Sequence, residues 1–430
     1  MNAPGFPSFR TCAVAALIVL AFATDPCNAA WGPGGVTVSA TTASIPSVEG
    51  CSDGGSGAFV VWQEERAAGQ GVLRAQHLLS NGDLDPVWPA AGAHVCDVVS
   101  GRTALGALPD HLGGFFTWWK EDNTLFVTRL EGNGQVAGGW PARGRSLGPV
   151  EFFVTPNPSV IEDGGNGIYA AWGLYQPGSP GHLAVVGIHL GPSNTGAGGW
   201  PDGIRTISPN DPVFTCSFFP QIALAPDGGI FLAHGTYSQD SEAVPNAFRL
   251  QRLTSAGVNA DGWPAEGVAV GPFHADDMTS YSTSLLGLSS DGRGGAFVLG
   301  GNPTGLSGAG TLEIETRLYR ATGAGVPAPD WPAEGRIMED APWYYTDFGA
   351  DGSYRVLPDG ADGALAGFPL LLADTDPTFG FQRIAATGQT QPHARIILAG
   401  HEVVRKPDGV IFLADFNPSG KSTPWTPTPP

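Results

Sequence analysis

A tryptophan-proline motif recurs along the chain and limits the possible folds more than any other feature. The segment WPAEG occurs twice, and close or looser variants of it occur along most of the sequence. The copies start at Trp31, Trp88, Trp140, Trp200, Trp263 and Trp331. They are about 50 to 70 residues apart, a period that indicates repeated structural units rather than one irregular domain.

Two other elements repeat together with this motif. An Asp-Gly turn leads into a short apolar strand, as in the segment from Asp53 to Trp62. A basic residue precedes the tryptophan by eleven positions in all five units that keep both, as Arg252 precedes Trp263. Fixed spacings indicate hairpins whose register is set by their turns, and variable spacings indicate connections that accept insertions. The turn residues are Asp53, Asp110, Asp163, Asp227, Asp291, Asp359 and Asp408, and the basic residues are His77, Arg129, His189, Arg252, Arg320 and Arg383.

A unit of about 57 residues with four short strands is typical of a β-propeller blade. The sequence therefore predicts an all-β, seven-bladed β-propeller of four-stranded antiparallel blades over residues 31–417. We name the strands of a blade a to d from the centre outward. Six blades are expected at approximately 46–98, 104–149, 157–208, 219–271, 283–340 and 353–399. The seventh is expected to combine residues 401–417 with an N-terminal strand at 31–40, which closes the ring and removes two exposed sheet edges.

The repeated unit resembles the tandem repeats of secreted bacterial β-propellers. The resemblance rests on DGG before strands such as AFVVW, on the basic residue of the next strand, and on WPxxG after it. It covers nearly the whole chain after the N-terminal segment. It implies the fold and export, and it implies no activity or catalytic residue because that family carries no agreed activity.

The N-terminal segment has the pattern of a cleaved secretory signal, predicted as residues 1–30. Arg10 precedes an apolar run from Ala13 to Ala23, and small residues follow. We therefore expect an exported protein, either extracellular or periplasmic, without membrane insertion because no apolar run is long enough to span a bilayer. Residues 418–430 are expected to be a Pro-rich tail. The three cysteines after the signal, Cys51, Cys96 and Cys216, are expected to be free thiols.

The charge balance excludes one class of partner. Lys+Arg 21 against Asp+Glu 40 gives a net charge of −19, whereas binding to nucleic acid requires a cationic surface. A carbohydrate or protein partner fits the composition better, and we expect a monomer. No cofactor is expected. Ca²⁺ at the Asp-Gly turns is the alternative considered, but each turn offers one carboxylate where Ca²⁺ takes six or more oxygen ligands.

The regular elements are interpreted as structural. One tryptophan per unit at one register fits packing between neighbouring blades, and the alternative is a multivalent ligand platform. The arginines of this series are expected to make buried charge-assisted hydrogen bonds to a carboxylate in the same or the next blade. They are Arg129, Arg252, Arg320 and Arg383. Their separation, one per blade in strand c, argues against the arginine cluster of a sialidase.

Function is expected where the repeat varies. Insertions concentrate in the b–c and d–a connections, which lie on one face of a propeller, and these connections carry aromatic and acidic residues. Such residues suit a saccharide or a cationic partner. The candidate ligand-binding residues are Trp62, Glu64, Trp118, Trp119, Asp122, Phe218, Asp276, Asp277, Tyr281, Trp343, Tyr344, Tyr345 and Asp347. No catalytic residue is assigned.

Three functions compete on this evidence. The main prediction is an exported, non-enzymatic β-propeller that binds a ligand or protein on the variable face. The first alternative is a glycan-acting hydrolase or lyase that uses carboxylates such as Glu64, Asp122, Asp276 or Asp347. The second alternative is a structural repeat protein of the cell envelope. The fold favours none of them, because propellers host all three.

Overall fold

The computed structural model describes residues 36–67, 70–99, 105–150, 158–175, 183–208, 216–237, 247–270, 284–306, 312–338, 343–344, 355–359, 362–370, 378–385, 394–396, 401–405 and 411–415. The strands in these ranges form separate antiparallel sheets, six of which have at least four strands. No helix occurs in the described ranges, and therefore none with the length and apolar character needed to cross a membrane.

The sheets follow one another along the chain. The first contains β1 (Ser47–Ser52), β2 (Ala58–Ala67), β3 (Gln70–Leu78) and β4 (Ala93–Val99). The second contains β5 (Leu105–Pro109), β6 (Phe115–Glu121), β7 (Thr124–Leu130) and β8 (Arg145–Pro149). The third contains β9 (Ser159–Glu162), β10 (Ile168–Tyr175), β11 (Leu183–Leu190) and β12 (Arg205–Ser208). The fourth contains β13 (Cys216–Leu224), β14 (Ile230–Tyr237), β15 (Ala247–Leu253) and β16 (Val268–Val270).

The remaining sheets are less uniform. The fifth contains β17 (Ser284–Ser290), β18 (Ala296–Leu306), β19 (Leu312–Ala321) and β20 (Arg336–Ile337), and β21 (Trp343–Tyr344) also pairs with β19. The sixth contains β22 (Arg355–Pro358), β23 (Ala364–Leu370), β24 (Thr378–Ile384) and β25 (Ala394–Ile396). The last consists of β26 (His401–Arg405) and β27 (Ile411–Asp415).

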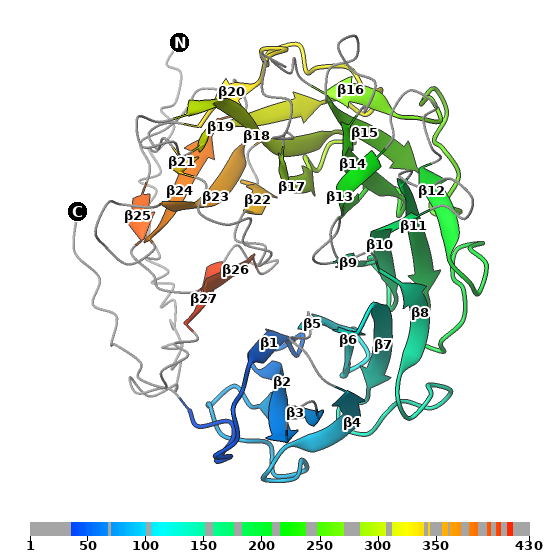
Figure 1. Ribbon diagram of the computed structural model, residues 1–430, viewed down its shortest axis with the longest axis vertical. Helices are drawn as coiled ribbons and strands as arrows, with labels where there is room; N and C mark the ends of the chain where they lie inside the picture. The colour runs from blue at the N-terminus through cyan, green and yellow to red at the C-terminus, as the bar shows by residue number, and fades with distance from the viewer. Residues whose placement is uncertain are drawn as a thin grey trace, which may run out of the picture.

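The arrangement is β-propeller-like. Each sheet of four or more strands is a meander with its first strand at one edge. Figure 1 shows the sheets side by side around a common centre, with these first strands on the inside. Consecutive inner strands contact each other, as β13 contacts β17 and β17 contacts β22. The predicted all-β architecture of four-stranded antiparallel sheets is confirmed.

The predicted bond from an arginine to a carboxylate is present in four sheets, and a histidine makes the equivalent contact in two more. In the second sheet, Asp110 Oδ1 accepts hydrogen bonds from the backbone of Leu112 and Gly114, which closes the turn. Its Oδ2 accepts a hydrogen bond from Arg129 Nε at 2.7 Å. One carboxylate therefore joins the first, second and third strands of its sheet. The other pairs are Asp53–His77, Asp163–His189, Asp227–Arg252, Asp291–Arg320 and Asp359–Arg383.

The repeated tryptophans join one sheet to the next. Trp140 Nε1 donates to the Pro192 carbonyl of the following sheet at 2.8 Å, while its ring packs against Phe116 of its own sheet. The same bond runs from Trp88 to Gly132, from Trp200 to Ser255 and from Trp263 to Gly323. Trp331 differs, because its Nε1 donates to Leu318 of its own sheet. These contacts support the structural interpretation of the tryptophans.

The N-terminal segment was predicted to form the outer strand of the last blade, and its described part does not do so. Residues 36–46 form no strand. Val36 and Val38 instead pack beside Val60 and Trp62, on a face of the first sheet. Residues 1–30 and 418–430 lie outside the described residues, so the signal peptide, export and the Pro-rich tail stay predictions.

Cys51 and Cys96 are free, as expected, and Cys96 is buried. Burial raises the pKa of the Cys96 thiol to about 12, and the nearby Glu121 carboxylate acts in the same direction. A thiol with such a pKa stays protonated at neutral pH and has little reactivity.

Candidate functional site at the hub

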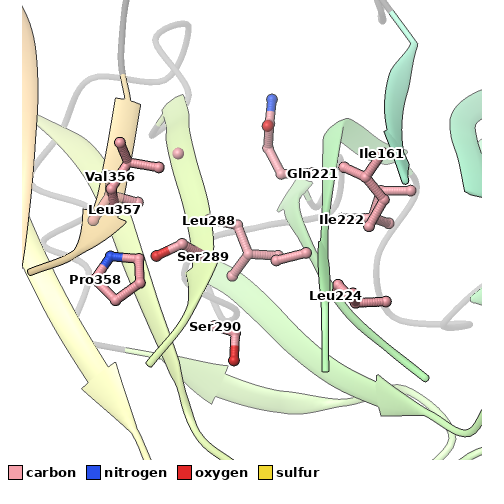
Figure 2. A pocket seen from close by; sticks show the side chains of 12 residues that line it. Ile161, Gln221, Ile222, Leu224, Leu288, Ser289, Ser290, Val356, Leu357 and Pro358 are labelled. Carbon is pink, nitrogen blue, oxygen red and sulfur yellow. The ribbon is translucent and has the colours of Figure 1, made fainter. Parts of the chain in front are cut away.

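A cavity of about 300 Å³ opens among the inner strands of four successive sheets. It is lined by residues of β9, β13, β17 and β22, which are the first strands of the third to the sixth sheet. We call the centre of the molecule the hub, and the first, innermost strand of each sheet its hub strand. Figure 2 shows residues of these four strands around the space, with Leu288 and Ser289 on opposite sides of β17. Strands far apart in sequence therefore contribute to one site at the centre of the molecule.

Two of the lining strands are distorted at the cavity. The pairing of β13 with β14 shifts register between Phe218 and Gln221, and the pairing of β17 with β18 shifts between Leu285 and Gly287. The described pairs of the hub strands β1, β5, β9 and β22 show no shift. A bulge bends a strand and redirects the next side chains, and bulges are common beside active sites. Both distortions directly precede residues that line the cavity.

A proline accounts for the distortion of β13. Pro220 is buried and lies within the register shift. Proline has no backbone N–H to donate to a ladder, so within a sheet it favours edges and bulges. The strand resumes regular pairing at Gln221, which is half-buried and lines the cavity. The proline therefore helps to determine which residues of β13 face the hub.

The cavity wall is mostly apolar and carries few polar groups. Ile222, Leu288 and Val356 provide hydrophobic surface, while Gln221, Ser289 and Ser290 provide side-chain polar groups. Ser290 Oγ accepts a hydrogen bond from the backbone of Gly292. Ser289 is 8% exposed, and its buried Oγ has no hydrogen-bond partner. Figure 2 shows this hydroxyl on the side of β22.

The hub strands begin at the end that lies opposite the Asp turns. Each hub strand ends just before the Asp turn of its sheet, so each begins at the opposite end of the hub. Strands β17 and β22 begin at Ser284 and Arg355. The segments that precede them contain five of the candidate residues, all of which lie outside the described residues: Asp276, Asp277, Tyr281, Tyr345 and Asp347.

Several predicted loop residues belong to strands instead. The segment WQEER lies within β2, and WWKE lies within β6, because the ladders with β3 and β7 continue through these residues. Trp62 is 2% exposed and Trp119 is fully buried, so neither ring has surface for a ligand. Trp119 stacks on Phe126 with the ring centroids 5.6 Å apart. Trp118 is partly buried against the core between the second and third sheets.

The two acidic candidates in the described residues also have structural positions. Glu64 Oε1 accepts a hydrogen bond from Trp62 Nε1, and Oε2 accepts one from Arg74 Nε at 3.0 Å. This carboxylate is therefore engaged by an indole and a guanidinium within its own sheet. Asp122 is exposed in the two-residue turn between β6 and β7, where it has φ of 52°.

The remaining aromatic candidates are strand residues. Phe218 lies in β13, next to the bulge, and pairs with Gly235. Trp343 and Tyr344 form β21 and pair with Ile314 and Glu313 of β19. These three positions were predicted in d–a connections, and the strands extend into those connections.

One buried titratable residue, His234, was interpreted from the sequence as a lone histidine rather than a ligand. His234 occupies the position in β14 that Trp172 occupies in β10, and it is 3% exposed. Burial lowers the pKa of its imidazole to about 4, and the charge of Arg249 acts in the same direction. The ring is therefore neutral at physiological pH and serves as a core group. In the described residues, no group of three or more His, Cys, Asp or Glu side chains is placed to hold a metal ion.

Comparison with known proteins gives structural similarities only. No family model matches the chain, and no curated protein matches its sequence. An endo-arabinase from Bacteroides thetaiotaomicron aligns over 66% of this chain and 89% of its own, with 12% identity and a TM-score of 0.33. The GH93 α-L-arabinofuranosidase of Fusarium graminearum aligns over 84% and 96%, with 9% identity and a TM-score of 0.38. The Hadza microbial sialidase Hz136 aligns over 78% and 68%, with 13% identity and a TM-score of 0.39.

The main functional prediction needs correction. A non-enzymatic binding protein was expected, whereas these similar solved structures are enzymes, so that prediction is contradicted and is not carried further. At such identities and TM-scores the similarities assign neither a reaction nor a substrate to this chain. An assignment has to come from the chemistry of the hub.

Proposed function

We propose that the chain is a glycan-acting hydrolase with its site at the hub. The observation that carries the proposal is the cavity between β9, β13, β17 and β22, together with the bulges that interrupt β13 and β17 beside it. A concave, mostly apolar site with a few polar groups is the usual form of a small-molecule site. Its neighbouring connections also contain the acidic residues that glycoside hydrolysis needs.

Hydrolysis of a glycosidic bond uses two carboxyl groups on opposite sides of the bond. One protonates the leaving oxygen, and the other activates water or attacks the sugar directly. We propose Asp347 for one of these roles and Asp276 or Asp277 for the other. Asp277 stands seven residues before β17 and Asp347 eight residues before β22, so both belong to connections that enter cavity-lining strands. Glu64 is a weaker choice because Trp62 and Arg74 already engage its carboxylate.

The proposal is tested by measuring reducing-sugar release from a panel of polysaccharides and aryl glycosides. Arabinan, an aryl arabinofuranoside and an aryl sialoside come first, because the similar structures include an endo-arabinase, an arabinofuranosidase and a sialidase. We expect hydrolysis by the wild type. We expect D347N and either D276N or D277N to lower kcat at least 100-fold, the low end for loss of an acid or base group.

The matched control is D261N, the same substitution at an exposed c–d turn on the opposite face. It should leave kcat unchanged. The proposed function fails if no glycan is hydrolysed, or if all three hub-side variants keep the wild-type kcat.

We also propose that the ring has seven blades and is closed by the N-terminal segment. Six sheets with at least four strands and the β26–β27 pair support the number. Val36 and Val38 stand five and seven residues after Trp31, as Ala93 and Val95 stand after Trp88. Val36 and Val38 pack on the first sheet, and Ala93 and Val95 lie in a core shared by the first and second sheets. The N-terminal segment therefore contributes the packing of an outer strand, although residues 36–46 make no ladder.

A further inference from the structure

We propose that the first sheet contains a pH-sensitive clamp, in which the protonated ring of His77 joins the a–b turn at Asp53 to the c–d turn at Asp85. Protonation of the ring completes the clamp, and loss of the proton opens it. The clamp concerns the stability of one sheet and its link to the next, so it is independent of the proposed function.

A carboxylate lies at each nitrogen of the His77 ring. Nδ1 is 2.8 Å from Asp85 Oδ2, and Nε2 is 3.3 Å from Asp53 Oδ2. A neutral imidazole has a single N–H, so one of its nitrogens turns a lone pair toward a carboxylate, whereas the imidazolium donates from both nitrogens. The arrangement is therefore complete only when His77 is protonated.

The second carboxylate is particular to the first sheet. Asp85 stands eight residues after His77, and its backbone N–H donates to the His77 carbonyl. In the next four sheets the equivalent backbone bond is made by an alanine, which offers no carboxylate. These residues are Ala137, Ala197, Ala260 and Ala328.

His189 shows that a histidine alone does not make such a clamp. It has the equivalent position in the third sheet, with Nε2 2.9 Å from Asp163 Oδ2, and its buried Nδ1 has no hydrogen-bond partner. A neutral ring with its proton on Nε2 fits these surroundings, so His189 needs no charge. The other four of the six larger sheets have an arginine at this position, which is charged at any physiological pH. They carry Arg129, Arg252, Arg320 and Arg383.

The charge around the clamp is mostly negative. Besides its two carboxylates, the titratable and charged groups at this end of the first and second sheets are Asp83, Asp110, His111, Arg129 and Glu131. Arg129 is paired with Asp110. His111 is paired with Glu162 of the third sheet. The two remaining acids are exposed, so the described surroundings match a positively charged ring.

The clamp is connected to the tryptophan that joins the first sheet to the second. Asp85 Oδ1 accepts a hydrogen bond from the Val87 backbone N–H, and the Asp85 carbonyl accepts one from the Trp88 backbone N–H. The Trp88 ring lies 6.3 Å from the His77 ring between centroids, and its Nε1 donates to Gly132 of the second sheet. Release of Asp85 from His77 therefore loosens the turn that positions Trp88.

The direction of the pH effect follows from which charges are present. The pKa of Asp85 lies below its ordinary value, first because the Val87 N–H donates to it, against the effect of burial, and further because of its bond with His77. Asp85 is therefore ionised throughout the pH range in which histidines lose their proton. The bonds to the charged ring exist only in the folded chain. Their contribution is thus complete in mild acid and is lost as the pH rises through that range.

The experiment measures amide hydrogen exchange of the full chain by mass spectrometry at about pH 5.5 and about pH 8.5, on either side of the usual histidine titration. The peptides compared contain the c–d turn of the first sheet, residues 79–92, and that of the third sheet, residues 191–204. Protection factors are corrected for the intrinsic effect of pH on exchange. From acid to base, we expect protection of the first-sheet turn to fall about tenfold more than that of the third-sheet turn, the effect of one charge-assisted hydrogen bond.

Two variants should abolish this additional fall. H77R supplies the permanent cation found in four other sheets, and D85A leaves one carboxylate, as His189 has. The matched control is H189R, the same change in the third sheet, which should leave the fall in the first-sheet turn unchanged. A197D places a carboxylate where the first sheet has Asp85, and it should give the third-sheet turn a similar pH dependence.

Each of these substitutions introduces a side chain that the equivalent position of another sheet already has, so we expect all four variants to fold. Loss of the additional fall in H77R and D85A, with H189R like the wild type, supports the clamp. The inference is overturned if protection of the two wild-type turns changes equally with pH, or if H77R or D85A keeps the wild-type fall.

Discussion

Each turn aspartate can connect several strands of its sheet through hydrogen bonds. Asp110 closes its turn through two backbone N–H groups and binds Arg129 with its other oxygen. Its side chain is fully buried, whereas the side chain of the equivalent Asp227 is 49% exposed in its pair with Arg252. A buried charge that loses its partner is far more costly than an exposed one, because water cannot replace the interaction. We therefore expect equivalent turn aspartates to contribute unequally to stability.

We predict that D110A lowers the free energy of unfolding by about 3 to 5 kcal/mol, since it leaves Arg129 and two turn N–H groups without their partner. D227A should cost about 1 kcal/mol or less from its ion pair, because that pair is largely in contact with water. Urea denaturation of the two variants measures the difference. Equal costs would show that burial does not determine the contribution of these pairs.

The sheet is the element that the repeat encodes, and the tryptophan is the link between sheets. Trp88, Trp140, Trp200 and Trp263 each donate to a carbonyl of the next sheet. The acceptor residues differ in type, but each lies three positions after the basic residue of its sheet. The regular spacing between the basic residue and the tryptophan therefore serves the contact between sheets as well as the hairpin. Trp331 departs from this pattern and bonds within its own sheet.

We predict that W140F destabilises the chain by about 1 kcal/mol, because it keeps the aromatic ring and loses the bond to Pro192. W140A should cost about 3 to 5 kcal/mol, because it also leaves a cavity between the sheets. Thermal and urea unfolding report both. V87A, which alters an exposed residue next to Trp88, is the control and should change stability by less than about 0.5 kcal/mol. A W140F variant as unstable as W140A would contradict the assigned role of the indole N–H.

On the scale of the whole molecule, the first sheet depends on a segment that comes before it in the chain. Val36 and Val38 cover a face of that sheet that includes Trp62 and Leu78. The Glu65 backbone N–H donates to the Ser44 carbonyl at 2.9 Å and holds the same segment against β2. In the proposed closed ring, this face is the one that meets the last blade.

We predict that V38D destabilises the chain by about 2 kcal/mol or more, because it places a charge against the apolar face around Trp62. I45D, a matched change at a side chain that is 43% exposed, should have little effect. Limited proteolysis and intrinsic tryptophan fluorescence follow the opening of the ring at this point. Proteolysis of V38D at the wild-type rate would argue against closure through this segment.

Local regularities were sufficient to predict the sheets and their internal bonds. The Asp turn, the basic residue and the tryptophan recur at constant spacings, and turn geometry converts constant spacing into one register. The four consecutive strands of the six larger sheets, a carboxylate partner for the strand-c arginines and the structural role of the tryptophans all follow from that, whereas β21 and the turn aspartate as that partner were not predicted. Strand ends were less predictable, and WQEER and WWKE were assigned to connections because hydrophobic alternation marks where a strand begins better than where it ends.

The residues that line the hub cavity could not be predicted from the sequence in the same way. Ser289 and Gln221 are 68 residues apart, and no spacing rule relates them. Pro220 was the one local signal, because a proline inside a strand pattern indicates a bulge. The cavity lies between residues of four sheets, whose arrangement depends on side-chain packing between sheets rather than on any repeat within one. Periodic residues thus encode the blade, and only the packed ring decides which unrepeated residues meet at its centre.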